Sequence, residues 1–171
     1  SLAIRASVAA KTNITYRILY NSTVAMTGGQ DAVGQMTIPE MVGELQAEGV
    51  ARIIVTSDEP RALKKQRMPG GVEVWPRDRL GEAQEILAKI PGTTVLIHEQ
   101  ECATELRRKR KRGLAKKPEE FVMINERICE GCGDCGEKSN CLSVQPVDTE
   151  FGRKTRIHQS SCNVDKSCLD G

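Results

Sequence analysis

The sequence has few aromatic side chains, no long hydrophobic run and no strong excess of charge of either sign. Aromatics make up 3% of the 171 residues and hydrophobic residues 39%, so a core must be built mainly from Val, Ile, Leu and Ala. The net charge of +2 argues against nucleic acid as the partner of the whole chain. No segment approaches the roughly 20 apolar residues of a membrane span, and no stretch resembles a secretory leader. We therefore expect a soluble, cytoplasmic protein with no membrane partner.

The two ends of the sequence indicate a piece of a longer polypeptide. Ser1 stands where an initiator Met would be expected, and residues 1–11 already have helical periodicity. The last residues, 168–171, stop inside a cysteine-rich run. We expect an internal fragment.

Strand and helix patterns alternate through the first two thirds of the chain. Strands are predicted at 14–20, 52–57, 72–75 and 94–98, and helices at 39–48 and 78–90, while 59–71 is loop or a short helix. This alternation predicts an α/β fold with an open, mainly parallel sheet flanked by helices. A helix beginning near 101 becomes very basic, and we place a domain boundary near residue 115. A short strand at 121–128 then leads into the cysteines.

Six of the seven cysteines lie between Cys129 and Cys168. An odd total and C-x-x-C spacing favour metal ligation over disulfides. Cys129, Cys132 and Cys135 form C-x2-C-x2-C, the run that wraps one 4Fe-4S cluster. The intervening glycines permit tight turns and bring backbone N–H groups near the sulfur atoms.

Cys141, Cys162 and Cys168 follow at looser spacing. In two-cluster ferredoxins the fourth cysteine of a motif ligates the other cluster, so residues 116–171 are predicted to form a small ferredoxin-like module with one or two clusters. Spacing does not decide which cysteine completes which cluster. A tetrahedral zinc site is the alternative. Cys102 stands apart, and it is interpreted either as a buried apolar thiol or as a residue with a ligand or redox role.

A polar, Gly-rich loop follows the first predicted strand. Because ligands of open α/β sheets bind at the carboxyl ends of strands, this loop is a candidate cofactor site. The Asn21 side chain and the Thr23 carbonyl offer the oxygen ligands that Mg²⁺ prefers. An ordinary turn remains the alternative reading of an Asn and a Gly-Gly pair.

The chain resembles the fused bacterial indolepyruvate ferredoxin oxidoreductases, which are thiamine-diphosphate enzymes of the 2-oxoacid:ferredoxin oxidoreductase group. The resemblance is carried by ITYRILYNSTVAMTGGQ, EGVARIIVTSDEP, CATELRRKRKRGL, CEGCGDCGEKSNCLSVQPVDTEFGRK and QSSCNVDKSCLDG. The segment at Asn21 looks like the second half of the thiamine-diphosphate motif, whose Gly-Asp-Gly half would lie upstream of Ser1.

The resemblance implies a partial thiamine-diphosphate-binding domain over residues 1–115. Asn21 and Thr23 would hold magnesium, and Met26, Thr27, Gly28 and Gly29 would line the cofactor.

The parent enzyme would oxidise aryl 2-oxoacids such as indolepyruvate to acyl-CoA, with coenzyme A as second substrate. Electrons would pass through Cys129, Cys132, Cys135, Cys141, Cys162 and Cys168 to ferredoxin. The full-length enzyme is expected to be a homo-oligomer that includes the remainder of this polypeptide. The fragment holds no catalytic residue and is predicted to be inactive alone. The alternative is a non-catalytic electron carrier on an α/β scaffold.

The basic run at 107–112 has three readings. It is a solvated helix end, a docking site for an acidic ferredoxin or for coenzyme A phosphates, or a nucleic-acid contact. The scarcity of aromatic side chains disfavours the last. His98 and His158 are both predicted to be structural or surface residues.

Overall fold

In the computed structural model, residues 1–21, 23–24 and 29–171 are described, and the chain divides into two compact units, Ser1–Glu105 and Leu106–Gly171. The division lies ten residues before the boundary predicted near residue 115. No helix in the described ranges combines the length and apolar character that crossing a membrane requires.

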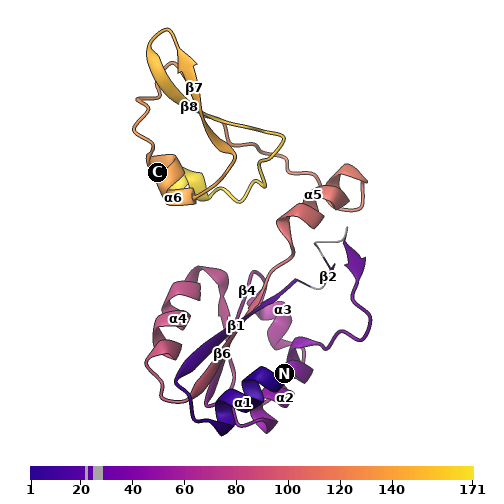
Figure 1. The fold of residues 1–171 in the computed structure, drawn as a ribbon. Coiled ribbons are helices and arrows are strands. Elements are labelled where there is room, and N and C mark those ends of the chain that lie inside the picture. The colour runs from indigo at the N-terminus through magenta and orange to yellow at the C-terminus, as the bar shows by residue number, and fades with distance from the viewer. Residues whose placement is uncertain (22, 25–28) are drawn as a thin grey trace. The chain divides into compact units, whose positions relative to one another are not determined.

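A four-stranded parallel sheet forms the centre of the first unit (Figure 1). Its strands are β1 (Ile14–Tyr20), β6 (Thr93–Glu99), β4 (Arg52–Ser57) and β5 (Glu73–Pro76), in that spatial order. β1 and β4 have the predicted bounds, and the predicted α/β class with a parallel sheet is confirmed. The central strands β4 and β6 are almost wholly buried, as expected for strands covered on both faces.

Helices cover both faces of this sheet. On one face, α1 (Leu2–Ala9), α2 (Ile38–Ala47) and α3 (Pro60–Lys64) pack on alternate residues of the strands, including Val55 and Ile97. On the other face, α4 (Leu80–Ala88) follows the short 3₁₀ helix η2 (Arg77–Arg79) and buries Leu87 against Ile54 and Leu96. Figure 1 shows α4 and the α1–α2 pair on opposite sides of the strands.

Local capping explains where α2 begins. The backbone N–H of Thr37 donates to Glu40 Oε2 at 2.7 Å, and the Thr37 hydroxyl accepts the Glu40 N–H at 3.4 Å. This reciprocal capping box satisfies two backbone donors at the start of the helix. The bonds from Thr37 hold the pKa of Glu40 below its ordinary range, with the backbone N–H as the larger cause and the hydroxyl as the second.

Two short strands lie between β1 and α2. These are β2 (Thr23–Val24) and β3 (Gln30–Asp31), which pair antiparallel. The sequence predicts only loop for this segment. The first unit ends inside α5 (Ala103–Lys111), whose first turn carries the buried Glu105.

The second unit contains α6 (Asp134–Ser139), the antiparallel hairpin β7 (Val144–Thr149) and β8 (Gly152–Ile157), and the 3₁₀ helix η3 (Ser167–Asp170). The hairpin was not predicted. Its strands are polar and only partly buried, so hydrophobic alternation gives little signal for them.

The strand predicted at 121–128 is wrong, because this stretch is irregular and ends in a turn. The Asn125 side chain accepts the N–H of Arg127 at 3.1 Å, and the Asn125 carbonyl accepts those of Ile128 and Cys129. Such local bonds offer the backbone an alternative to a sheet. Val122 is buried, but its carbonyl accepts the Gln159 side chain at 2.7 Å rather than a neighbouring strand.

Candidate functional site: the cysteine segment and the carboxyl end of the sheet

All six clustered cysteines lie in the second unit, on elements that fold back on one another. Cys135 is in α6 and Cys168 in η3, and these two helices pack together. A Cβ added to Gly171 would lie 2.6 Å from the backbone nitrogen of Cys135. The chain after Cys162 therefore returns to the C-x2-C-x2-C run, which brings cysteines far apart in sequence into one region.

Three of the sulfur atoms accept a backbone N–H from the residue two positions later. Gly131, Ser143 and Val164 donate to Cys129, Cys141 and Cys162 respectively, each at 3.4 Å. Hydrogen bonds of this kind stabilise a thiolate and help to set the potential of an iron–sulfur cluster. The repeated turn is the feature of this segment that spacing alone did not reveal.

The loop at Gly131 has no room for a side chain. Its φ is +71°, and a Cβ there would overlap the carbonyl oxygen of Arg153 in β8. Only glycine adopts this conformation without strain. The close approach of the two backbones holds the Cys129 turn against the hairpin.

The first cysteine of the run lies in a setting that favours its thiolate. The pKa of the Cys129 thiol is lowered, first by the Gly131 N–H and then by the Thr155 N–H, with a smaller contribution from the Lys154 ammonium. Lys154 also donates to the Cys129 carbonyl at 2.5 Å. Deprotonated sulfur is the form that binds metal.

Cys168 lies in a setting that disfavours its thiolate. Burial raises the pKa of its thiol, with a smaller contribution from the Asp165 carboxylate. The Ser143 and Ser161 hydroxyls are 3.0 Å apart, so the segments that carry Cys141 and Cys162 lie side by side. All seven cysteines are free thiols. Within the described ranges, no three Cys, His, Asp or Glu side chains already converge on a point suited to a metal ion.

In the first unit, Asn21 and Thr23 lie just beyond the carboxyl end of β1. Asn21 Oδ1 accepts the Thr23 N–H at 3.2 Å, and Thr23 Oγ1 is buried without a hydrogen-bond partner among the described atoms. Their oxygens are of the type that Mg²⁺ prefers. Met26, Thr27 and Gly28 lie outside the described residues.

Glu105 is a residue of this region that was not predicted from the sequence. Its side chain is only 3% exposed, and a Cβ added to Gly29 would overlap its carboxylate. A glutamate at the start of so basic a helix is expected on the surface, so no pattern in the sequence indicates that it is buried. Its carboxylate lies against the glycine that ends the Asn21–Gly29 segment.

The carboxyl ends of β4 and β6 carry a network of polar side chains. Thr56 Oγ1 is 2.8 Å from His98 Nδ1, and His98 Nε2 is 3.1 Å from Gln100 Oε1. Ser57 donates to Glu99 at 2.6 Å. Both ring nitrogens of His98 thus have partners, which supports the structural role predicted for it.

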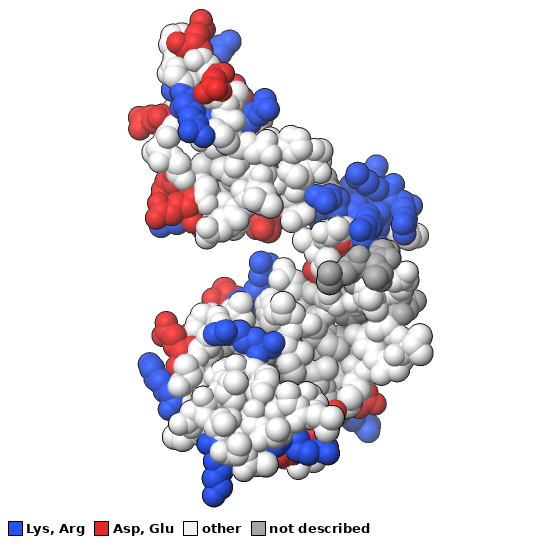
Figure 2. All heavy atoms as spheres, in the orientation of Figure 1, with Lys and Arg blue, Asp and Glu red and all other residues white. Residues whose placement is uncertain are grey.

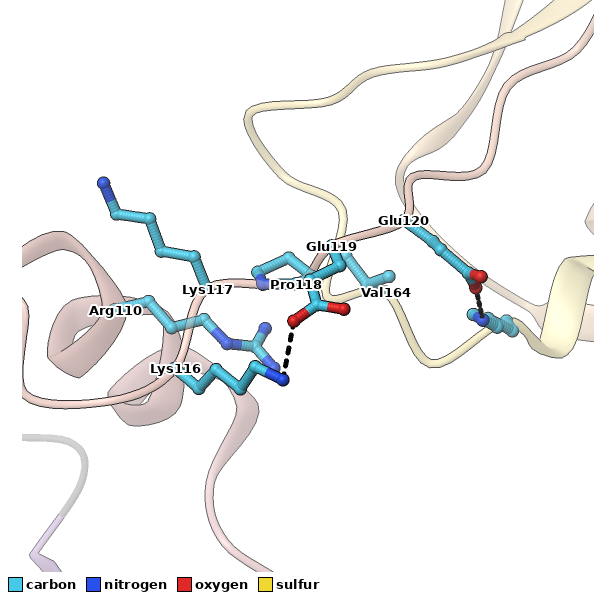
Figure 3. A pocket seen from close by; sticks show the side chains of 8 residues that line it. Arg110, Lys116, Lys117, Pro118, Glu119, Glu120 and Val164 are labelled. Carbon is cyan, nitrogen blue, oxygen red and sulfur yellow. Dashed lines mark hydrogen bonds and ion pairs between the residues drawn. The ribbon is translucent and has the colours of Figure 1, made fainter.

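The basic run forms a concentrated patch of positive charge over α5 (Figure 2). The second unit also contains a cavity of about 390 Å³, whose lining includes Arg110, Lys117 and Val164. Lys116 and Lys166 also line it and pair with Glu119 at 2.7 Å and Glu120 at 2.5 Å (Figure 3). The Lys166 ammonium lowers the pKa of Glu120.

No protein-family model, curated protein or solved structure matches the chain.

Proposed function

We propose that the chain is the cofactor-holding and electron-exit part of a cytoplasmic thiamine-diphosphate-dependent oxidoreductase, which converts aryl 2-oxoacids such as indolepyruvate to acyl-CoA and reduces ferredoxin. The observation that carries the proposal is the set of three N–H···S turns at Cys129, Cys141 and Cys162, each 3.4 Å long. Thiols held in this way suit a ferredoxin-like module better than free surface cysteines, which need no such donors.

The chemistry of the donors fits iron–sulfur groups. Six thiols lie in one small unit, and the pKa of the Cys129 thiol is lowered by the N–H groups around it. In the proposed module these six cysteines, Cys132 and Cys135 among them, ligate one or two 4Fe-4S clusters. The backbone N–H donors offset negative charge on the sulfur atoms.

The position of Asn21 and Thr23 supports a site for magnesium and thiamine diphosphate. They follow the carboxyl end of a parallel strand, where open α/β sheets bind ligands. The Asn21 side-chain oxygen and the Thr23 carbonyl would be two of the magnesium ligands, and Met26–Gly29 would line the cofactor. When bound, thiamine diphosphate would supply the nucleophilic carbon and the electron sink that decarboxylation of a 2-oxoacid requires, and the clusters would supply one-electron acceptors.

Anaerobic reconstitution with iron and sulfide tests the cysteine module. We expect a brown protein with a broad visible absorbance band that dithionite bleaches. Cys132→Ser should reduce iron loading, whereas Cys102→Ser, a control outside the cluster segment, should not. A colourless protein that holds stoichiometric zinc instead would refute the iron–sulfur assignment.

Equilibrium binding of thiamine diphosphate, with and without Mg²⁺, tests the other unit. Asn21→Ala should abolish the magnesium-dependent part of the binding. Asn13→Ala is the matched control, because Asn13 accepts the Gly92 N–H at 2.7 Å in the same unit and has no proposed contact with the cofactor. Binding that Asn21→Ala leaves unchanged would contradict the magnesium assignment.

A non-catalytic electron carrier is the second candidate. It is favoured by the compactness of Leu106–Gly171 as a unit of its own. Clusters that form normally in a chain with no magnesium-dependent cofactor binding would support the carrier over the enzyme.

A further inference from the structure

The basic helix is hydrogen-bonded to the segment that carries Cys162. Arg107 Nη1 donates to the Ser161 carbonyl at 3.3 Å, and Arg110 Nη1 donates to the Asn163 carbonyl at 3.4 Å. The two arginines are three residues apart in α5, so they lie on the same face of the helix. Their guanidinium groups therefore hold the two carbonyls on either side of one cysteine.

Other bonds keep this segment in place. The hydroxyl of Ser161 is 3.0 Å from that of Ser143 and 2.9 Å from His158 Nδ1. The Cys162 N–H donates to the His158 carbonyl at 3.2 Å. Because Ser161 is bonded to Ser143 and to His158, the backbone on either side of Cys162 is held in place where the two guanidinium groups bind it.

Both guanidinium groups carry charge that water screens incompletely. Arginine stays protonated at any pH a protein tolerates, and both side chains are partly buried. Arg110 Nε is buried and has no hydrogen-bond partner among the described atoms. In Figure 3, Arg110 extends toward the side of the cavity where Lys116 and Glu119 meet.

We propose that Arg107 and Arg110 are positioning residues that bracket Cys162 and raise the reduction potential of the iron–sulfur group it ligates. This inference rests on the proposed iron–sulfur function. Reduction adds one negative charge to a cluster, and a nearby fixed positive charge stabilises the reduced form more than the oxidised form. The basic run thus acts toward the chain's own cysteines, which distinguishes it from a solvated helix end or a nucleic-acid contact.

The experiment is a potentiometric titration, monitored by electron paramagnetic resonance, of the whole chain after anaerobic reconstitution. Cys162→Ser identifies the signal of the group that Cys162 ligates. Arg107→Gln and Arg110→Gln should each shift that signal to lower potential, and the double variant should shift it furthest. Arg107→Lys and Arg110→Lys keep the charge and should restore most of the parental potential.

Lys111→Gln and Arg112→Gln are the matched controls, since they remove the same charge from the same basic run. Both side chains are exposed, and exposed charges are screened beyond about 10 Å at ordinary ionic strength. Their small effects should vanish in high salt, whereas the effects of Arg107 and Arg110 should persist.

The outcomes separate the two proposals. A parental chain that takes up no iron and sulfide overturns both. Glutamine variants that load fully but keep the parental potential overturn the role of the arginines and leave the iron–sulfur function standing. If the glutamine variants load poorly, the lysine variants decide. Lysine variants that load fully and keep the parental potential support the role of the two arginines. Lysine variants that load fully at a lower potential overturn it.

Discussion

Gly29→Ala should destabilise the first unit through a contact with one buried side chain. Gly29 has a φ of +79°, a left-handed conformation, and a Cβ there would overlap the carboxylate of Glu105, which is 3% exposed. The left-handed conformation costs an alanine about 1–2 kcal/mol. The overlapping atoms are the far end of a flexible side chain, so overpacking adds only about 1 kcal/mol. The free energy of unfolding should therefore fall by about 2–3 kcal/mol.

Urea unfolding followed by the fluorescence of Trp75 measures this loss selectively. Trp75 is the only tryptophan of the chain and is 9% exposed in β5, so its signal reports the first unit. Gly43→Ala is the matched control. Gly43 lies inside α2, and apart from its own helix backbone and chain neighbours no described heavy atom is within 4 Å of its added Cβ. This second alanine should stabilise the unit by about 0.5–1 kcal/mol.

A double-mutant cycle isolates the contact. In a Glu105→Ala background the carboxylate is gone, so Gly29→Ala should cost only the conformational part, about 1–2 kcal/mol. If Gly29→Ala lowers the free energy of unfolding equally in both backgrounds, the overlap with Glu105 contributes nothing and the predicted contact is refuted.

Three further predictions test other parts of the chain. Leu87→Ala, at a fully buried position of α4, should lower the free energy of unfolding by about 2–5 kcal/mol in the same urea assay, and a loss below that range would mean that the α4 face is loosely packed. The lowered pKa of Glu40 means that its carboxylate stabilises the fold above its unfolded pKa of about 4.3, and that this contribution disappears as the pH falls through the lower folded pKa. The stability difference between the parent and Glu40→Gln should therefore shrink as the pH falls below the unfolded pKa and through the lower folded pKa, and a constant difference would argue against the bonds from Thr37. Gly131→Ala should lower iron loading on reconstitution, because its Cβ would overlap the Arg153 carbonyl. Gly136→Ala should not, because its Cβ would lie 3.6 Å from a valine methyl. Equal loading in both variants would contradict the close approach of the Gly131 and Arg153 backbones.

Where the signal is local, the sequence predicted the fold well. β1 and β4 have their predicted bounds, because runs of β-branched and aliphatic residues between breakers fit a covered strand. The bond from Asn21 to Thr23 spans only two residues. It belongs to the turn chemistry that an Asn after a strand already indicates.

The prediction failed where the deciding partner is distant or polar. Residues 121–128 have strand-like composition, yet Gln159 takes the Val122 carbonyl and Asn125 turns the chain. The β7–β8 hairpin buries little, so its pairing leaves almost no hydrophobic pattern. Composition reports how well a segment suits a strand, and it does not report whether a neighbouring strand exists.

The sequence by itself determined the α/β class of the first unit and the prediction of cluster chemistry, because both rest on residue type and short spacing. Only the tertiary structure decided the strand order, the burial of Glu105 against Gly29, and the bonds from Arg107 and Arg110 to the carbonyls beside Cys162. The contacts of Glu105, Arg107 and Arg110 join groups more than 50 residues apart, and the pairs β1–β6 and β4–β6 join residues 79 and 42 apart. Such contacts depend on how the chain closes its long loops, and no local pattern of residues encodes that closure.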